Sequence, residues 1–269
     1  DLGRTTGLSS IGVTKFQYCT ALSAIVLPEG IGSIDENAFD GCTSLASVTI
    51  PDTVNEIGQF AFLNCSALKS IEIPNSVTTI ASGAFRECTA LTSIEIPRRV
   101  ITIGSDSFNG CTALESIEIP DSVTTIERAA FHGCSSLTDV YIPDSVTEIG
   151  NQTFTNCSNL KSIVLSAGIT SIAEQVFREC TSLTSIEIPD GVSEIKSSAF
   201  MKCEVLESIT IPVSVTSIET GAFVSCNKLE SVKYKGLSDD WSGIAIGSNN
   251  PFESGSGIKI ICSDNTITL

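Results

Sequence analysis

Apolar residues return along this chain with a strict period of 23 residues. Cysteines keep this spacing from Cys19 to Cys226, and phenylalanines from Phe16 to Phe223 precede them by three residues. Each copy, here called a rung, begins with a leucine at position 0 and reads L-x-S-I-x-I-P-D-x-V-x-x-I-x-x-x-A-F-x-x-C-T-x. The rung leucines are Leu22, Leu45, Leu68, Leu91, Leu114, Leu137, Leu160, Leu183, Leu206 and Leu229. Such a repeat predicts one small unit stacked many times, with function on its surface.

Positions 2 to 5 of each rung alternate polar and apolar residues, as in Ser70, Ile71, Glu72 and Ile73. This period of two predicts a strand with isoleucine inward and serine and glutamate outward. Proline follows at position 6 in most rungs and ends the strand, because it cannot donate to a ladder; Ser166 replaces it once. Since every rung runs the same way, the strands must be parallel.

The second half of each rung is apolar at positions 9, 12, 16, 17 and 20. The last four have roughly helical spacing, which predicts one short helical turn over positions 13 to 18. Position 19 is often glycine or asparagine, which tolerate the left-handed conformation that closes a helix. In four rungs this position is instead occupied by Glu87, Glu179, Lys202 and Ser225.

The sequence therefore predicts an α/β repeat fold. We expect a right-handed solenoid with a concave parallel sheet of about ten strands and short helical turns on the convex side. Residues 1–21 are expected to form a partial N-terminal rung, residues 22–234 the repeats of 23 residues, and residues 235–269 a C-terminal cap.

Both predicted ends differ from the repeats. Phe16 and Cys19 match the second half of a rung, whereas Arg4 would occupy an inward strand position. The chain begins without methionine and shows no signal peptide, so we expect a natural start, signal or anchor to be missing. At the other end Trp241 is expected to plug the last rung, the alternative being an exposed binding anchor. Ile260 lies in a predicted final strand.

The L-x-x-I-x-I-P, V-x-x-I and A-F-x-x-C segments resemble the Treponema-type leucine-rich repeats of BspA-like bacterial surface proteins. The similarity covers most of the chain. It departs from ordinary leucine-rich repeats at position 8, where Thr53, Ser76 and Ser122 stand in place of the usual asparagine. The resemblance implies an extracellular or surface-attached recognition protein, often an adhesin, and leaves the ligand open.

The net charge of the chain limits which classes of partner it can bind. The chain has 15 basic and 31 acidic residues and a net charge of −16. Strong acidity disfavours nucleic acid and anionic membranes, which are bound through Lys and Arg clusters. It favours a basic protein patch or a divalent cation, although it also simply keeps a secreted array soluble. No apolar stretch approaches the roughly 20 residues of a membrane span, so we expect no membrane insertion.

The regular cysteines have two interpretations. Stacked rungs would bring their Cα atoms within the ~4.4 to 6.8 Å that a disulfide requires. However, one cysteine at a fixed inward position is typical of a small apolar core residue, and pairing among identical neighbours would be ambiguous. We expect reduced, buried cysteines. No two of them have the close spacing of a zinc site, so no metal is expected.

Motifs of known enzymes are missing from the sequence. The single histidine, His132, stands at a position that other rungs fill with Asp40, Leu63 or Arg86. There is no G-x-S-x-G, H-E-x-x-H or glycine-rich phosphate loop. We therefore expect neither catalytic activity nor a cofactor.

The outward strand positions are the candidate binding surface. Three glutamates follow one another at position 4, with an aspartate and a tyrosine in the next rung. Like charges on neighbouring strands destabilise a sheet, so this arrangement indicates a site for Lys or Arg side chains; the alternative is that glutamate merely fills a duplicated repeat. The candidate partner-binding residues are Glu72, Glu95, Glu118, Asp139, Tyr141 and Glu187.

Two functions remain open. One is a cell-surface or secreted adhesion module that binds a protein or glycan of a host or neighbouring cell as a monomer. The other is a structural spacer or stalk within a larger surface protein. Departures from the consensus at Asp139, Tyr141, Arg98 and Arg99 favour recognition, because a spacer has no reason to concentrate variation on one face.

Overall fold

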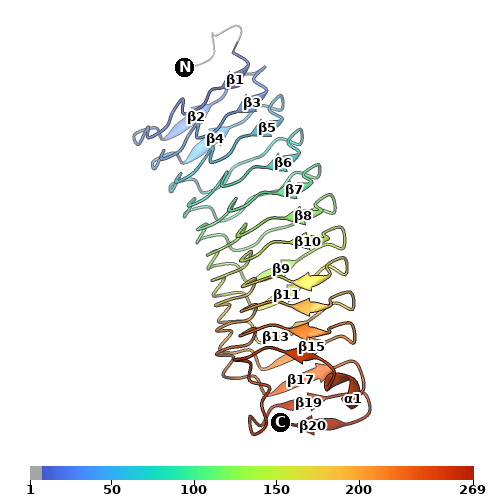
Figure 1. The fold of residues 1–269 in the computed structure, drawn as a ribbon. Helices are drawn as coiled ribbons and strands as arrows, with labels where there is room; N and C mark the ends of the chain where they lie inside the picture. Colours follow the sequence, from blue (N-terminus) through green and yellow to red (C-terminus); the bar gives the residue numbers. More distant parts are fainter. Residues whose placement is uncertain (1–7) are drawn as a thin grey trace.

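A computed structural model describes residues 8–269 of the chain. The rungs stack along one axis from the N-terminal to the C-terminal end and form two sets of parallel strands (Figure 1). Neighbouring rungs pair in register, so that a residue lies beside its equivalent in the next copy, as Ser33 beside Glu56. The predicted parallel solenoid is confirmed.

The strands at positions 2 to 5 form an interrupted ladder, so the prediction of one sheet with about ten strands is wrong. Between the second and sixth rungs the structure shows one isolated bridge, from Glu95 to Glu118. At the C-terminal end the strand Thr266–Thr268 runs antiparallel to the strand Lys259–Ile261. The paired groups are β2 (Ala24–Val26) with β4 (Ser47–Thr49), β9 (Asp139–Tyr141) with β11 (Ser162–Val164), and β13 (Ser185–Glu187), β15 (Ser208–Ile211), β17 (Ser231–Tyr234), β19 (Lys259–Ile261) and β20 (Thr266–Thr268) in that order.

A second ladder, which the sequence did not predict, runs through positions 11 and 12. Each of its strands has two residues, with the position-12 isoleucine turned toward the core in most rungs. One group contains β1 (Ser10–Ile11), β3 (Ser33–Ile34), β5 (Glu56–Ile57), β6 (Thr79–Ile80), β7 (Thr102–Ile103), β8 (Thr125–Ile126) and β10 (Glu148–Ile149). The other contains β12 (Ser171–Ile172), β14 (Glu194–Ile195), β16 (Ser217–Ile218) and β18 (Ala245–Ile246).

The predicted helical turns at positions 13 to 18 are wrong. This part of each rung, here called the turn side, is a series of tight turns. In the second rung the Ala61 N–H donates to the Gly58 carbonyl at 3.3 Å, whereas the Phe62 N–H donates to Ala84 of the next rung at 2.9 Å. A helix needs every N–H to bond four residues back. Alternate N–H groups here bond to the next rung instead, which holds the stack together.

Two backbone positions on the turn side have positive φ in all nine complete rungs from Asn37 to Ser225: positions 15 and 19. Position 19 was predicted from its glycines and asparagines, and Glu87 and Lys202 also adopt it. The positive φ at position 15 was not predicted, because the position holds residues such as Phe60 and Ala129, which rarely adopt this conformation. Both have φ of 55° here. Position 15 is the third residue of a tight turn, and this type of turn requires positive φ there. The left-handed conformation costs a residue other than glycine ~1 to 2 kcal/mol, and the hydrogen bonds between rungs outweigh this cost.

The core contains two continuous columns, as predicted. The phenylalanine rings from Phe16 to Phe223 stack with centroids 5.1 to 5.9 Å apart and planes within 22° of each other. The cysteines from Cys42 to Cys226 are buried beside them. Cys19, in contrast to the prediction, is exposed. Neighbouring rungs therefore supply most of the burial of each apolar side chain.

The C-terminal residues extend both ladders by one rung through β18 and β19. The helix α1 (Ser238–Trp241) lies at this end (Figure 1). Trp241 is buried, with its ring edge-on to Tyr234 at 5.5 Å and to Phe252 at 5.8 Å, as expected of a plug. Ile260 is buried in β19, in agreement with the predicted final strand. Arg4 lies outside the described residues.

Candidate functional site

All six candidate residues have exposed side chains on the outer face of the interrupted ladder. We call this surface, made of the side chains at positions 2 and 4, the strand face. Glu95 and Glu118 are register partners on neighbouring rungs, so two of the three consecutive glutamates lie side by side. Glu72 lies in an unpaired segment on the preceding rung.

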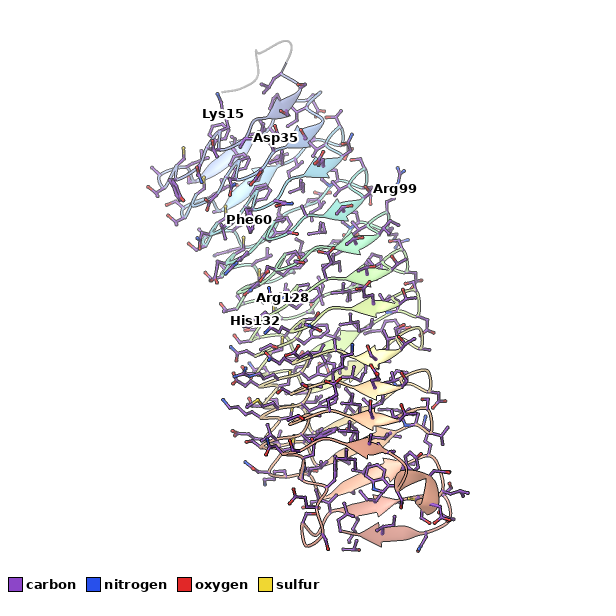
Figure 2. All side chains as sticks on the ribbon, in the orientation of Figure 1. Lys15, Asp35, Phe60, Arg99, Arg128 and His132 are labelled. Carbon is purple, nitrogen blue, oxygen red and sulfur yellow. The ribbon has the colours of Figure 1, made fainter. Side chains whose placement is uncertain are left out.

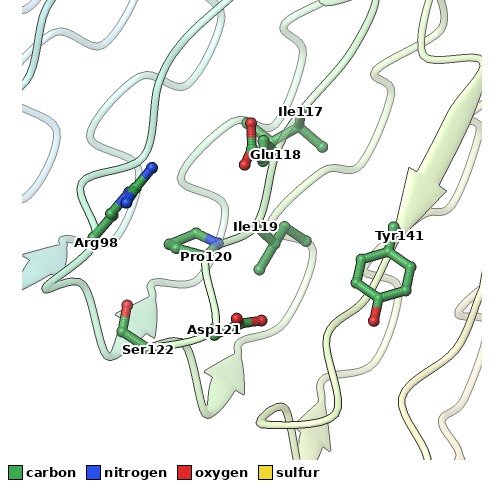
Figure 3. A pocket seen from close by; sticks show the side chains of 8 residues that line it. All are labelled: Arg98, Ile117, Glu118, Ile119, Pro120, Asp121, Ser122 and Tyr141. Atoms are coloured by element: carbon green, nitrogen blue, oxygen red, sulfur yellow. The ribbon is translucent and has the colours of Figure 1, made fainter.

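A hollow of about 490 Å³ opens on the strand face beside Tyr141. We call it the Tyr141 hollow. Its base is the segment 117–122 of the fifth rung, with Arg98 of the fourth rung on one side and Tyr141 of the sixth on the other (Figure 3). Glu118 and Asp121 add two carboxylates. The hollow therefore contains an aromatic ring, a guanidinium and two carboxylates from three successive rungs.

The polar groups of this hollow have no charged partner of their own. Among residues 8–269, none of Arg98, Glu118 and Asp121 forms an ion pair. Tyr141 is 58% exposed. An exposed aromatic ring and unpaired charges in one concave place are available to a ligand.

The ladder of strands is open at this hollow. Where the strands of neighbouring rungs pair, the N–H at position 5 donates to the position-4 carbonyl of the next rung, as from Leu27 to Thr49 at 3.0 Å and from Ile142 to Val164 at 2.9 Å; the second to fifth rungs and the seventh rung lack this bond. In the fifth rung Ile119 is buried, and its N–H makes no such bond to Tyr141. Backbone polar groups that lack a partner are costly when buried, so this gap offers bonds to a bound molecule or to water.

A second hollow of about 370 Å³ lies two rungs further along, where β11 and β13 are likewise not paired. Here the Lys235 ammonium lies 2.9 Å from Glu187 and 2.8 Å from Asp190. Two hydrogen bonds to these carboxylates raise the pKa of Lys235. Glu187, a predicted site residue, is therefore already paired within the chain and lies apart from the Tyr141 hollow.

Exposed apolar surface connects the two hollows, since Tyr141 lines the first and Val164 the second. Tyr141 of β9 and Val164 of β11 are register partners, and Val164 is 57% exposed. Asp139, in the same strand as Tyr141, accepts a hydrogen bond from the Ser162 hydroxyl, and this bond is the main cause of its lowered pKa. The structure thus groups Glu118 and Tyr141 around one hollow, with Asp139 two residues from the ring.

Arg98 and Asp121 were absent from the predicted site. Arg98 had been noticed as a departure from the consensus, which was the available signal; Asp121 is an ordinary consensus residue. Lys235 gave no signal, because the repeat ends before it. Its pairing with Glu187 becomes visible only when the rungs are stacked.

The turn side offers no comparable chemistry. His132 lies there close to Arg128 (Figure 2), half-buried, and its burial lowers its pKa. In the described part of the chain, no three His, Cys, Asp or Glu side chains gather in a way that would hold a metal ion. Residues 8–269 also contain no helix with the length and apolar character needed to cross a membrane.

Parallel rungs with leucine and isoleucine inside define the class of leucine-rich repeat proteins. The chain belongs to the family described as BspA type leucine rich repeat region (6 copies), whose profile matches residues 9–138 and 125–242. The predicted family is confirmed.

Solved structures of bacterial proteins are similar to this chain. A leucine rich cell surface protein of Faecalibacterium prausnitzii is 32% identical over 88% of this chain and 79% of its own, with a TM-score of 0.49. The leucine rich repeat protein of T. pallidum is 28% identical over 79% and 80%, with a TM-score of 0.48. One from Eubacterium ventriosum is 24% identical over 91% and 80%, with a TM-score of 0.57, a likeness of fold. A search of curated proteins gives no match.

Proposed function

We propose that this chain is a recognition module of a bacterial cell surface, where it binds a protein or glycan of a host or neighbouring cell through its strand face. The family membership and the F. prausnitzii relative, itself a cell surface protein, support the location. The module binds as a monomer, outside the cell, and performs no chemistry.

The observation that carries this proposal is the contrast between the core and the strand face. The buried phenylalanine and cysteine recur without exception from the first to the ninth complete rung. At the exposed position 4, glutamate gives way to Tyr141 and Val164 in the middle of the array, beside a hollow of about 490 Å³. Uniform stacking requires no such change, whereas a binding site does.

The acidic strip of Glu72, Glu95 and Glu118 gives this surface its charge. Like charges on adjacent rungs repel, so their accumulation is better explained by a partner that brings Lys or Arg side chains to the strip. Within the module we assign residues 1–21 to a partial rung, 22–234 to the recognition repeats and 235–269 to a cap that protects the last rung from water.

A structural spacer or stalk is the second candidate function. The regularity of the phenylalanine stack favours it, because a spacer needs only length and stiffness. A spacer has no use for a hollow with unpaired charges on one face. The two functions therefore differ in whether the isolated chain binds to cells at all.

The test is saturable binding of the labelled full chain to cultured epithelial cells and to bacterial cells. A recognition module binds until its receptors are filled and is displaced by excess unlabelled chain. Binding that fails to saturate on every cell type, or that unlabelled chain does not displace, contradicts recognition and favours the spacer.

A further inference from the structure

The Tyr141 hollow differs in chemistry from the acidic strip beside it. Its wall includes Arg98, whose guanidinium opposes the entry of a Lys or Arg side chain. Two carboxylates, Glu118 and Asp121, face the same space and oppose an anion. A hollow that rejects both signs of charge is suited to a neutral ligand with many hydrogen-bonding groups.

We propose that the Tyr141 hollow binds a short neutral saccharide. A sugar hydroxyl both donates and accepts, so it can donate to Glu118 or Asp121 and accept from Arg98. The carbon-bound hydrogens of a sugar ring form an apolar face that packs against an exposed aromatic ring such as Tyr141, while the phenol oxygen stays hydrated. The inference rests on the proposed function, because it names the ligand class of the same surface.

The open ladder adds main-chain contacts to this site. The N–H of Ile119 and the carbonyl of Tyr141 do not bond to each other, although the equivalent groups of Ile142 and Val164 do, at 2.9 Å. A neutral molecule with hydroxyl groups can bond to both. The volume of about 490 Å³ also falls within the ~300 to 1,000 Å³ of small-molecule sites.

A basic peptide is the competing ligand. It would bind to the acidic strip at Glu72 and Glu95, which lie two rungs and one rung before the fifth rung at the base of the hollow, rather than inside the hollow. Its affinity would fall steeply with salt, whereas a neutral saccharide depends on stacking and hydrogen bonds that salt screens little. The two ligands thus differ both in the residues they need and in their salt dependence.

The experiment measures binding of the full chain to an array of neutral hexose and N-acetylhexosamine oligosaccharides and to a lysine-rich peptide, at 50 and 500 mM NaCl. The variants are Tyr141→Ser, Tyr141→Phe and the pair Glu118→Gln with Asp121→Asn. Glu204→Gln is the matched control, because it removes an exposed charge outside the strand face. Thermal unfolding followed by circular dichroism checks that each variant folds.

We expect saccharide binding that Tyr141→Ser and the double variant each weaken by about tenfold or more, and that Tyr141→Phe and Glu204→Gln leave within about twofold. The rise in salt should change it by less than about twofold. Array binding that survives in a folded Tyr141→Ser variant overturns the proposal, as does a wild-type chain that binds no saccharide. If that chain still saturates on cells, only the saccharide inference fails; if it binds neither cells nor either probe, the proposed function fails as well.

Discussion

The Cys111 thiol donates a hydrogen bond to the main-chain carbonyl of Phe85, in the preceding rung, across 3.1 Å. The same bond joins the cysteine of every rung from Cys42 to Cys226 to the phenylalanine carbonyl of the rung before it, at 3.0 to 3.3 Å. The cysteines therefore act as small core residues and also as donors that link neighbouring rungs. Alanine would fill the space less well and supply no donor.

Replacing Cys111 by alanine should lower the free energy of unfolding by about 1 to 2 kcal/mol. The variant loses a thiol hydrogen bond and leaves a small cavity in the column of buried cysteines, next to Phe85 and Phe108. Chemical denaturation followed by circular dichroism measures the change. Cys19→Ala is the control, because Cys19 is exposed and its loss should cost less than about 0.5 kcal/mol. Equal costs at the two positions would show that the column does not stabilise the stack.

Thiol accessibility provides a separate test of the column. Cys19 is exposed and Cys262 partly exposed, while the nine cysteines between them are buried. A maleimide at neutral pH should label the folded chain at the two outer cysteines and react with all eleven after denaturation without reductant. Intact mass spectrometry counts the labels. Failure to label the buried nine in denaturant would mean that they are bridged, against the expectation of reduced thiols.

Stability should fall at alkaline pH. Burial raises the pKa of Cys111 and Cys157 from 9.0 to about 12, and that of Cys42 to about 11. Below pH 9 the thiols are protonated in both states, and their contribution is fully present. As the pH rises above 9, thiols of the unfolded chain ionise first, so each buried thiol removes about 1.4 kcal/mol of stability per pH unit until its folded pKa is reached.

Denaturation at pH 7.5, 9.5 and 10.5 measures this dependence. Other groups also titrate there, so the decline for the wild-type chain is compared with that for Cys111→Ala. The variant lacks one buried thiol and should lose less stability over the same interval. Identical slopes would contradict the assignment of the decline to buried thiols.

Backbone strain at position 15 can be tested with two adjacent alanines. Both are buried, but Ala129 has φ of 55°, whereas Ala130 has no positive φ. Glycine relieves the strain of Ala129 at a cost in chain entropy, so Ala129→Gly should leave stability about unchanged. Ala130→Gly gains nothing and should lose about 1 kcal/mol or more. Equal losses in the two variants would show that position 15 carries no strain.

The core of the fold could be predicted because its signal is local and repeated. The phenylalanine at position 17 and the cysteine at position 20 recur in every rung, and a side chain that never changes in a stack is an inward one. The turn side could not be predicted in the same way. Positions 12, 16, 17 and 20 have the spacing of a helix, but their N–H groups bond alternately within the rung and to the next, as those of Ala61 and Phe62 do. The spacing of apolar residues does not reveal where N–H groups bond.

The candidate site was only partly predictable for a different reason. Tyr141 stood out because it breaks the glutamate series, and Glu118 because it belongs to that series. Asp121 follows the consensus, so nothing in the sequence distinguishes it from other aspartates at that position. The pairing of Glu187 with Lys235 spans two rungs and joins a repeat to the segment after the repeats, a contact that periodicity does not contain.

Removing the acidic strip tests the charge of the strand face. The variant with Glu72, Glu95 and Glu118 all replaced by Gln should fold and gain slightly in stability, because the like charges of Glu95 and Glu118 no longer face each other at a cost of roughly 0.2 to 1 kcal/mol. Replacing Glu36, Glu174 and Glu204, which are exposed outside the strand face, removes the same charge and is the matched control.

The most direct measurement of recognition through the strand face is the association rate of these two triple variants and the wild-type chain with the cells that the wild-type chain saturates, at low and high salt. We expect the strand-face variant to associate more slowly and with less salt dependence, while the control variant keeps the wild-type rate. Equal rates and equal salt dependence in all three proteins would show that the strand face does not recognise the partner through its charge.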